Sequence, residues 1–571
     1  MSVAGGLMVR VLAFASRGAR RIGVWGWLSL LVIALATSAK ALESTYYVFI
    51  YDDDIYVRMA VGFLHGQWSS VTLSRGAGWP IFLAASHFLP WTPTLSVFLV
   101  YVLGVVLIAT SWYLLRNSKP QAFAVVLFLS MNPIFFTVQN QRLERDAFIC
   151  AVSTVAIGLF LLVGVRITHD LTTARVLRLT AMVSVLGITV GVVAITKPTW
   201  LWLVVGLAAV GLPFATHLAR RRGWKSASIR VGLVVVAFLA GFFVTVQTCK
   251  TLNSRKYHVA LVDDFSSGAF ARTWKLWASV ETGKVRPFVQ ITSTMRAAVY
   301  AISPTAAKLA PYLESPNDPL KKVDCESIVH ICNESGAWLP WDIRLAAQDT
   351  GAIGSNYDLQ RFFSQIADDI ARACSDRKLR CSTSPVLGTG LPPLNDISLT
   401  DVLSNTAHGL QDMIWDRLPI GPTPSIMRTQ AEYEVWSSVV SGMPSYRSLA
   451  KSTGSDIAYP ALRLLDVLYG IGNLALLALA AAGAGASVFA LSRGPRIQRR
   501  GDSTPGGAAI AGALVIAPLV GMAILGLFQA GQGQPYVTPL YWTDFATPLQ
   551  LALVIGGVTG WTCLRGYREG R

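Results

Sequence analysis

The chain has 571 residues, of which 53% are hydrophobic and only 14% are charged, and its mean hydropathy is +0.47. Ordinary soluble domains carry about 25% charged residues, so this composition excludes a soluble globular enzyme. The formal net charge of +17 suggests a nucleic-acid-binding protein, but the basic residues are spread over short segments between apolar runs rather than gathered on one domain.

Apolar runs of about 20 residues recur along the chain, each long enough to cross roughly 30 Å of hydrocarbon. The first run follows a basic leader and resembles a cleavable secretion signal, but its length favours a retained anchor. We expect about ten membrane-spanning helices, at 22–41, 93–115, 120–138, 147–165, 179–196, 199–217, 229–248, 460–491, 507–529 and 546–564.

The connections between these runs predict the topology. Alternate short segments hold 21 Lys and Arg residues against three acidic residues: 1–21, 116–119, 166–178, 218–230, 492–506 and 565–571. By the positive-inside rule these segments are cytoplasmic, and so are both termini. The sequence therefore predicts an integral membrane protein, of the plasma (inner) membrane of a bacterium, whose basic excess is a topology signal that also suits anionic lipid head groups.

A long polar segment, 249–459, interrupts the spans. Its length predicts one α-rich or α+β extracytoplasmic domain between the seventh and eighth helices. It separates an N-terminal membrane module of seven spans, 1–248, from a C-terminal module of three spans, 460–571. Apolar residues at helical spacing predict an amphipathic helix over 358–375 within the domain: Leu359, Phe362, Phe363, Ile366 and Ile370.

The predicted outer domain holds four of the seven cysteines, as two Cys-x6-Cys pairs. An even number of cysteines in an oxidising compartment indicates disulfides. We favour Cys325–Cys332 and Cys374–Cys381, although three connectivities exist. A four-cysteine zinc site is the alternative, but paired zinc ligands usually lie two to four residues apart, so no metal site is predicted.

Three consecutive carboxylates, Asp52, Asp53 and Asp54, follow the first span at the predicted outer membrane surface. Such neighbours repel one another and raise one another's pKa, and the nearby hydrocarbon adds a desolvation cost. This arrangement favours a general base or a cation site, while the plainer interpretation is a solvated helix start. A divalent cation is compatible with the cluster, but no cofactor is predicted with certainty. The apolar residues that follow predict an amphipathic helix lying on the membrane.

The turn between the third and fourth predicted spans packs four charges of both signs into five positions: Arg142, Glu144, Arg145 and Asp146. One interpretation is a salt-bridged hairpin turn. The other is a second pair of catalytic carboxylates, Glu144 and Asp146, with arginines for a phosphate, because Arg makes bidentate contacts with phosphate.

Two further cations lie on the predicted outer side. Lys197 occupies a tight turn between two spans, where it either snorkels to the interface or contacts a lipid phosphate. Arg75 begins the run Arg-Gly-Ala-Gly, which we interpret as a flexible turn in which Arg75 is a weaker candidate for phosphate contact.

These motifs resemble the GT-C superfamily of membrane glycosyltransferases. The pattern Asp52-x-x-x-Tyr56-x-x-x-Ala60 is similar to the acidic motif that follows the first span there. Glu144-Arg145-Asp146 and Thr196-Lys197-Pro198 are similar to the superfamily's later charged turns, and the loop 533–544 is similar to its final outer loop. The resemblance covers about 250 N-terminal residues, and weakly the last loop, and it identifies no subfamily.

The resemblance implies a sugar donor carried on a polyprenyl phosphate and an inverting transfer to a glycan, lipid or protein acceptor outside the cytoplasm. It implies Asp52, or else Asp53, as general base, with cations holding the leaving phosphate. Two alternatives stay open: a surface-polysaccharide polymerase or ligase, and a non-enzymatic transporter or assembly scaffold. Nucleic acid is not an expected partner, whereas membrane lipids are.

Overall fold

The structure is a computed structural model that describes residues 23–42, 51–65, 72–283, 289–316, 334–415, 429–440, 458–492 and 548–559, with isolated positions between 510 and 527 and short gaps at 138–139, 141, 169–171, 199, 337 and 352. These residues are mostly helical, none of them belongs to a β-strand, and an isolated bridge pairs Val280 with Cys381.

Eight described segments are long and apolar enough to span a membrane. They lie on α2 (Val24–Leu42), α5 (Pro93–Arg116), α6 (Lys119–Ser130) with η2 (Pro133–Phe136), α8 (Arg145–Ile167), α9 (Thr173–Ala194), α10 (Trp200–Arg222), α11 (Trp224–Tyr257) and α22 (Ala458–Ser492). The predicted polytopic α-helical membrane fold is confirmed. Of the remaining predicted spans, 546–564 is represented by a short apolar helix, Pro548–Thr559, and 507–529 lies almost entirely outside the described residues.

α8 is the centre of the bundle and packs against α5, α9 and α10. Glycines allow two of the closest helix approaches. A Cβ at Gly104 of α5 would collide with the backbone of Thr154 on α8, and a Cβ at Gly241 of α11 would collide with the carbonyl oxygen of Ser184 on α9. Small residues allow backbones to approach in this way where lipid provides no hydrophobic driving force between helices.

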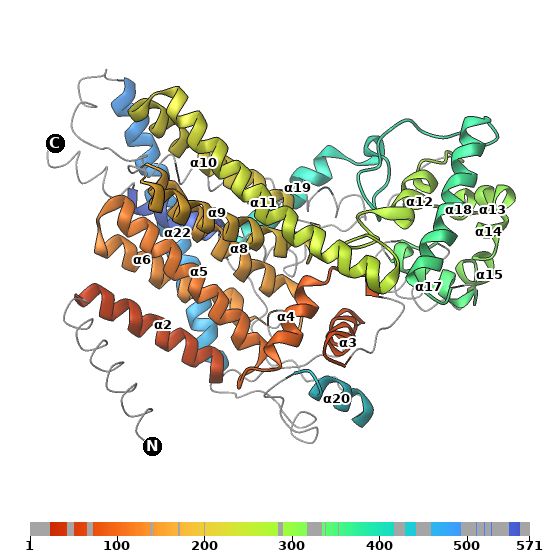
Figure 1. Ribbon diagram of the computed structural model, residues 1–571, viewed down its shortest axis with the longest axis horizontal. Coiled ribbons are helices and arrows are strands. Elements are labelled where there is room, and N and C mark those ends of the chain that lie inside the picture. Colours follow the sequence, from red (N-terminus) through yellow and green to blue (C-terminus); the bar gives the residue numbers. More distant parts are fainter. Residues whose placement is uncertain are drawn as a thin grey trace.

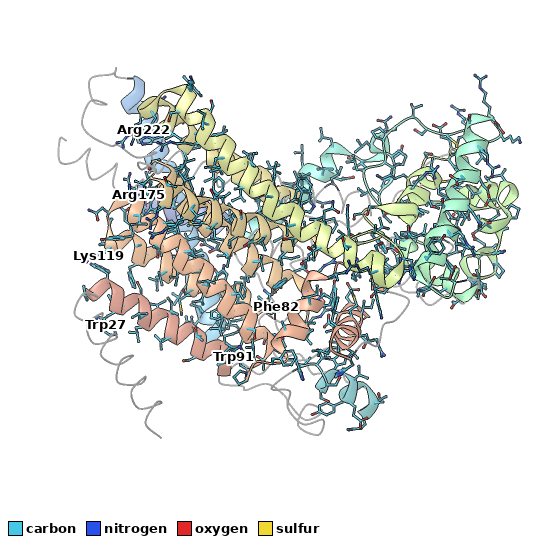
Figure 2. The ribbon with its side chains drawn as sticks, in the orientation of Figure 1. Trp27, Phe82, Trp91, Lys119, Arg175 and Arg222 are labelled. Atoms are coloured by element: carbon cyan, nitrogen blue, oxygen red, sulfur yellow. A yellow bond between two sulfur atoms is a disulfide. The ribbon has the colours of Figure 1, made fainter. Side chains whose placement is uncertain are left out.

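Successive spans run in alternate directions, so their connections gather at two ends of the bundle. Figure 2 shows Lys119, Arg175 and Arg222 at one end of the bundle, away from the large helical layer that residues 268–375 form. The opposite end carries the first-loop helices α3 (Tyr51–His65), η1 (Thr72–Ser74) and α4 (Gly78–Ser86), which Figure 1 shows between the bundle and that layer. The charged turns around 142–146 and 195–198 start or end spans at this same end.

The helical layer, here called the helical domain, consists of α12 (Gly268–Ala278), α13 (Ser293–Ile302), α14 (Pro304–Ala307), α15 (Ala310–Leu313), α17 (Leu339–Asp349) and α18 (Asn356–Ser375). Its core packs α12 against α18. The five apolar residues expected on one face of α18 are all buried, so the predicted helix over 358–375 is confirmed. A disulfide joins Cys374 to Cys381 as predicted, whereas Cys325 and Cys332 lie outside the described residues.

α11 joins the bundle to the helical domain as one continuous helix. It has 34 residues and extends nine residues beyond the predicted span, which ended at 248. At 1.5 Å per residue it is about 51 Å long, longer than the roughly 30 Å of a hydrocarbon core. Its last turns therefore project past the bundle, and His258 ends the helix in the left-handed conformation.

The remaining described elements are η4 (Leu394–Asp396), α19 (Leu399–Trp415) and α20 (Gln430–Ser437). α19 packs on α22, and α20 packs on α3. The chain between the helical domain and α22 therefore returns to the bundle and contacts the first-loop helix.

Where α9 and α11 cross, we expect Gly→Ala substitutions at two positions of α11 to change stability in opposite directions. Gly241→Ala is expected to lower the unfolding free energy by about 1–3 kcal/mol, because the added methyl group collides with backbone. Gly232→Ala, in the same helix with open space around it, is the control and is expected to raise stability by up to about 1 kcal/mol. Thermal unfolding of both variants in lipid nanodiscs checks this; equal effects would contradict it.

Candidate active site

The three aspartates lie in the first turn of α3, where their charge complements the helix dipole. Consecutive residues of an α-helix point about 100° apart, so the three side chains face different neighbours. Their exposures differ accordingly: the side chain of Asp52 is 31% exposed, Asp54 16% and Asp53 0%. Each carboxylate is paired with a different arginine.

Asp52 accepts a hydrogen bond from Nη2 of Arg75, whose side chain is buried. The run after Arg75 is a docked segment rather than the flexible turn we expected. The backbone N–H of Gly78 donates to the carbonyl oxygen of Ile195 over 3.1 Å, and a Cβ on Gly76 would collide with that same oxygen. The glycines therefore allow a close approach that brings Arg75 to the turn containing Lys197.

Asp53 and Glu144 share Arg142. Its Nε and Nη2 bond the two carboxylate oxygens of Asp53 at 3.2 and 2.9 Å, and Nη2 also bonds Glu144 at 2.9 Å. Burial raises the pKa of Asp53 to about 6 despite the opposing charge of Arg142. Burial, with the negative charges of Asp53 and Asp52, raises the pKa of Glu144 to about 8. Glu144 is therefore mostly protonated at neutral pH.

Asp54 is held from two sides. Arg58, one turn along α3, donates to it over 2.6 Å, and Nε1 of Trp436 donates over 3.4 Å. Trp436 is fully buried in α20. The sequence contained no signal for this contact, because 382 residues separate the two side chains.

Asp146, in the first turn of α8, forms a buried ion pair with Lys197. Asp52 remains ionised: burial favours the neutral form, but Arg75, Arg145 and Arg142 together lower its pKa. The structure thus brings nine charged candidates into one cluster at the end of the bundle that faces the helical domain: Asp52, Asp53, Asp54, Arg75, Arg142, Glu144, Arg145, Asp146 and Lys197. The final loop 533–544 lies outside the described residues.

Three buried hydrogen-bond donors of this cluster have no partner within the described part of the chain: Nε of Arg75, Nε of Arg145 and the hydroxyl group of Tyr56. The guanidinium of Arg145 lies 5.9 Å from the centre of the Tyr56 ring. Buried donors without a partner are rare in folded proteins. Both arginines thus have a buried nitrogen available to an anion, but Arg75 is already paired with Asp52, so Arg145 is the stronger candidate for anion binding. The role of Tyr56, although it stands in the Asp52 motif, was not predicted.

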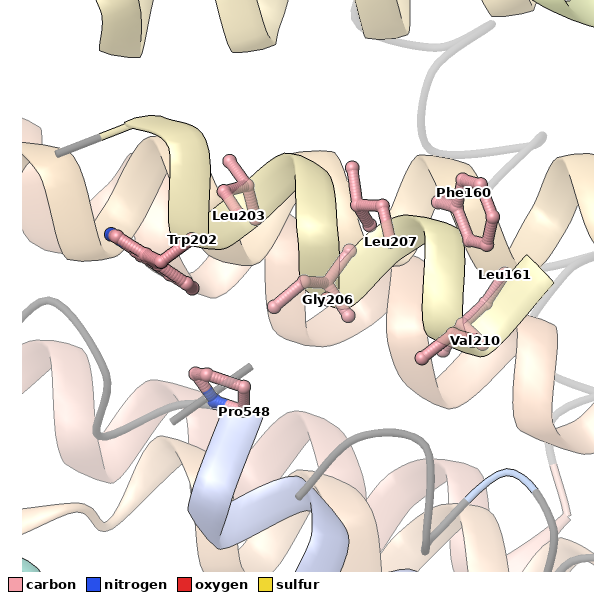
Figure 3. A pocket seen from close by; sticks show the side chains of 9 residues that line it. Phe160, Leu161, Trp202, Leu203, Gly206, Leu207, Val210 and Pro548 are labelled. Atoms are coloured by element: carbon pink, nitrogen blue, oxygen red, sulfur yellow. The ribbon is translucent and has the colours of Figure 1, made fainter. Parts of the chain in front are cut away.

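Other features bear on what the cluster can hold. In the ranges that the structure covers, no group of three or more His, Cys, Asp or Glu side chains is arranged to hold a metal ion. A small apolar pocket lies between α8, α10 and the helix Pro548–Thr559. Figure 3 shows its lining residues, among them Trp202, Leu207 and Pro548, all of them apolar or glycine.

Comparisons with known proteins give limited likeness. No family model and no curated protein matches the chain. Two solved structures of ArnT from Cupriavidus metallidurans match at a TM-score of 0.29. One is bound to undecaprenyl phosphate (14% identity, 94% of this chain and 78% of that chain), and the other is in the apo state (13%, 93% and 78%). ArnT is a GT-C glycosyltransferase, of the superfamily that the motifs resemble. At this TM-score the likeness does not bear on the reaction.

The raised pKa of Glu144 predicts a pH dependence of stability. Because the pKa of Glu144 in the folded protein lies above the ordinary glutamate value of 4.5, folding favours the protonated form. Stability therefore falls as the pH rises from about 4.5, and the loss is complete above about 8. Glu144→Gln is expected to flatten the decline of Tm between pH 5 and 8.5.

Thermal scans over this pH range, in nanodiscs, check the prediction. Asp376→Asn, which removes an exposed carboxylate outside the cluster, is the control and is expected to keep the wild-type slope. An equal slope in Glu144→Gln and the wild type would contradict the assignment.

Proposed function

We propose that the protein is an inverting membrane glycosyltransferase that moves a sugar from a polyprenyl-phosphate donor to an acceptor outside the cytoplasm. The observation that carries the proposal is the cluster itself, in which one partly exposed aspartate lies beside a buried arginine with an unpartnered nitrogen. A carboxylate and a cation with an unsatisfied donor at one site suit a reaction in which a base removes a proton and a phosphate leaves.

The side of the membrane follows from the distribution of charge. Basic residues such as Lys119, Arg175 and Arg222 lie at the end of the bundle opposite the cluster (Figure 2). The positive-inside rule makes that end cytoplasmic. The cluster and the helical domain are then extracytoplasmic, at the depth where the phosphate of an amphipathic donor resides.

Asp52 is the best candidate for the general base. Asp53 is fully buried with both oxygens bonded by Arg142, and Asp54 is held by Arg58 and Trp436. Asp52 has the most exposed side chain of the three and a lowered pKa, so its carboxylate is ionised and accessible. It takes the proton of the acceptor hydroxyl group while that oxygen attacks the anomeric carbon from the face opposite the phosphate.

The bond between the anomeric carbon and the phosphate oxygen breaks in the same step, and the phosphate leaves with the electron pair. Arg145 binds this phosphate, because its buried Nε lacks a partner and a guanidinium matches phosphate oxygens. Arg75, Arg142 and Lys197 add positive charge while paired with carboxylates. Glu144 and Asp146 hold Arg142 and Lys197 in place.

The non-enzymatic alternative gains less support. A transporter is expected to carry its charged residues near the middle of the membrane, beside broken helices. The paired charges of the cluster lie at one end of the bundle rather than at mid-membrane depth, and Asp466 within α22 is the exception. This arrangement suits chemistry at the membrane surface better than passage through it.

Replacing the base separates chemistry from binding. Asp52→Asn is expected to lower the rate of sugar transfer from a polyprenyl-phosphate donor by about 100-fold or more, because general-base catalysis contributes about 10²–10⁴. Its affinity for undecaprenyl phosphate should change little. Asp54→Asn is the control and is expected to keep most of the rate. Transfer assays with radiolabelled donor check both, and full activity of Asp52→Asn would remove the assignment.

Replacing Arg145, the proposed phosphate-binding residue, is expected to affect donor binding, in contrast to replacing Asp52. Arg145→Gln is expected to weaken undecaprenyl phosphate binding about 10- to 100-fold, as for loss of a hydrogen bond to a charged group. Arg58→Gln, which removes an exposed arginine bonded to Asp54, is the matched control. Equal affinities of the two variants, measured by native mass spectrometry, would refute a phosphate role for Arg145.

A further inference from the structure

The segment that leads into the helical domain is hydrogen-bonded to the first outer loop beside Arg75. The backbone N–H of Asp264, between α11 and α12, donates to the carbonyl oxygen of Leu73 over 2.9 Å. Asp264 is itself fully buried and forms an ion pair with Arg344 of α17. The segment before α12, which is tied to α17 through this ion pair, thus fixes the backbone two residues before Arg75.

The same helix covers the guanidinium of Arg75. The ring of Trp341 on α17 lies 4.0 Å from the guanidinium carbon, within the range of a cation–π contact. Arg75 is almost fully buried, so the ring replaces water on one face of the cation. The opposite charge is supplied by Asp52. Arg75 therefore has a membrane-module carboxylate on one side and a helical-domain ring on the other.

Trp341 is held in this position by the domain. Its ring lies 4.5 Å from that of Phe265, and the carbonyl oxygen of Phe265 accepts a 2.6 Å hydrogen bond from Thr389. The adjoining buried pair of Asp264 and Arg344 fixes the start of α17 against the same loop. The ring is therefore positioned by packing within the domain, independently of the aspartate triplet.

We propose that Trp341 is a positioning residue for the reaction, which holds Arg75 against Asp52 and makes the helical domain part of the active site. This inference rests on the proposed role of Asp52 as base. The charged and titratable groups that face Asp52 are Arg75 from the first loop, Tyr56 and Asp53 from α3, and Arg142, Glu144 and Arg145 from the turn before α8 and its start. Loss of the Trp341 ring leaves all of them in place and loosens only Arg75.

The pH dependence of transfer tests this position. In Trp341→Leu, Arg75 holds the Asp52 carboxylate less firmly, so the acidic limb of kcat/KM is expected to move to higher pH by about half a unit to one unit. Trp341→Phe keeps an aromatic face and is expected to restore the wild-type limb. Trp277→Leu is the matched control, because Trp277 is a fully buried tryptophan of the same domain that contacts Tyr300 rather than Arg75. It should lower Tm without moving the limb.

A double-mutant cycle tests the contact without any turnover. Tm is measured for Trp341→Leu, Arg75→Met and the double variant, and the loss in the double variant is expected to be smaller than the sum of the two single losses. Additive losses of Tm in the cycle would overturn the proposal. So would an acidic limb of kcat/KM that moves as far in Trp277→Leu as in Trp341→Leu. If the wild type transfers no sugar from polyprenyl-phosphate donors, the proposed function fails and the cycle alone decides whether Trp341 holds Arg75.

Discussion

Three adjacent carboxylates in one helical turn repel one another. The structure at the end of the bundle that faces the helical domain depends on how neighbouring positive charges offset this repulsion. Each aspartate of α3 receives its own arginine, from a different segment: Arg75 from the first loop, Arg142 from the turn before α8, and Arg58 from α3 itself. Opposite charges within a few ångströms favour the ionised form and offset the desolvation of burial. The aspartate triplet therefore draws the connections of four spans together, and the active-site geometry follows from that charge balance.

The pairing also separates the roles of chemically identical residues. The bidentate bonds from Arg142 make Asp53 a structural group, and burial raises its pKa, whereas partial exposure and three nearby cations keep Asp52 ionised. Glu144, protonated at neutral pH, limits the negative charge next to Asp53. A site built in this way can keep an ionised base and a surplus cation within one small volume. Neighbouring groups with divergent pKa values are a recurring arrangement in acid–base enzymes.

Much of this architecture follows from local sequence. The spans are predicted by apolar runs that must satisfy their backbone hydrogen bonds internally, and α18 by the spacing of its buried residues. The charged turns were identified because each is costly near lipid. Their pairing was not predictable, because Asp53 meets Arg142 across 89 residues. Trp436 and Trp341 reach the site from the polar half of the chain, where aromatic residues are ordinary core components. Arg75 was undervalued because its glycines, read as signs of flexibility, serve close packing instead.

The uninterrupted α11 acts as a fixed spacer between the lipid surface and the domain that carries Trp341. Each residue inserted into a helix adds about 1.5 Å of height and about 100° of rotation. A single insertion would therefore swing α17 to another side of the bundle while hardly changing its elevation. Only insertions close to whole turns, such as seven residues, would raise the domain and keep its orientation. The length of α11 can therefore change only in steps of about whole turns. The distance between the helical domain and the membrane, which an incoming acceptor must enter, changes in the same steps.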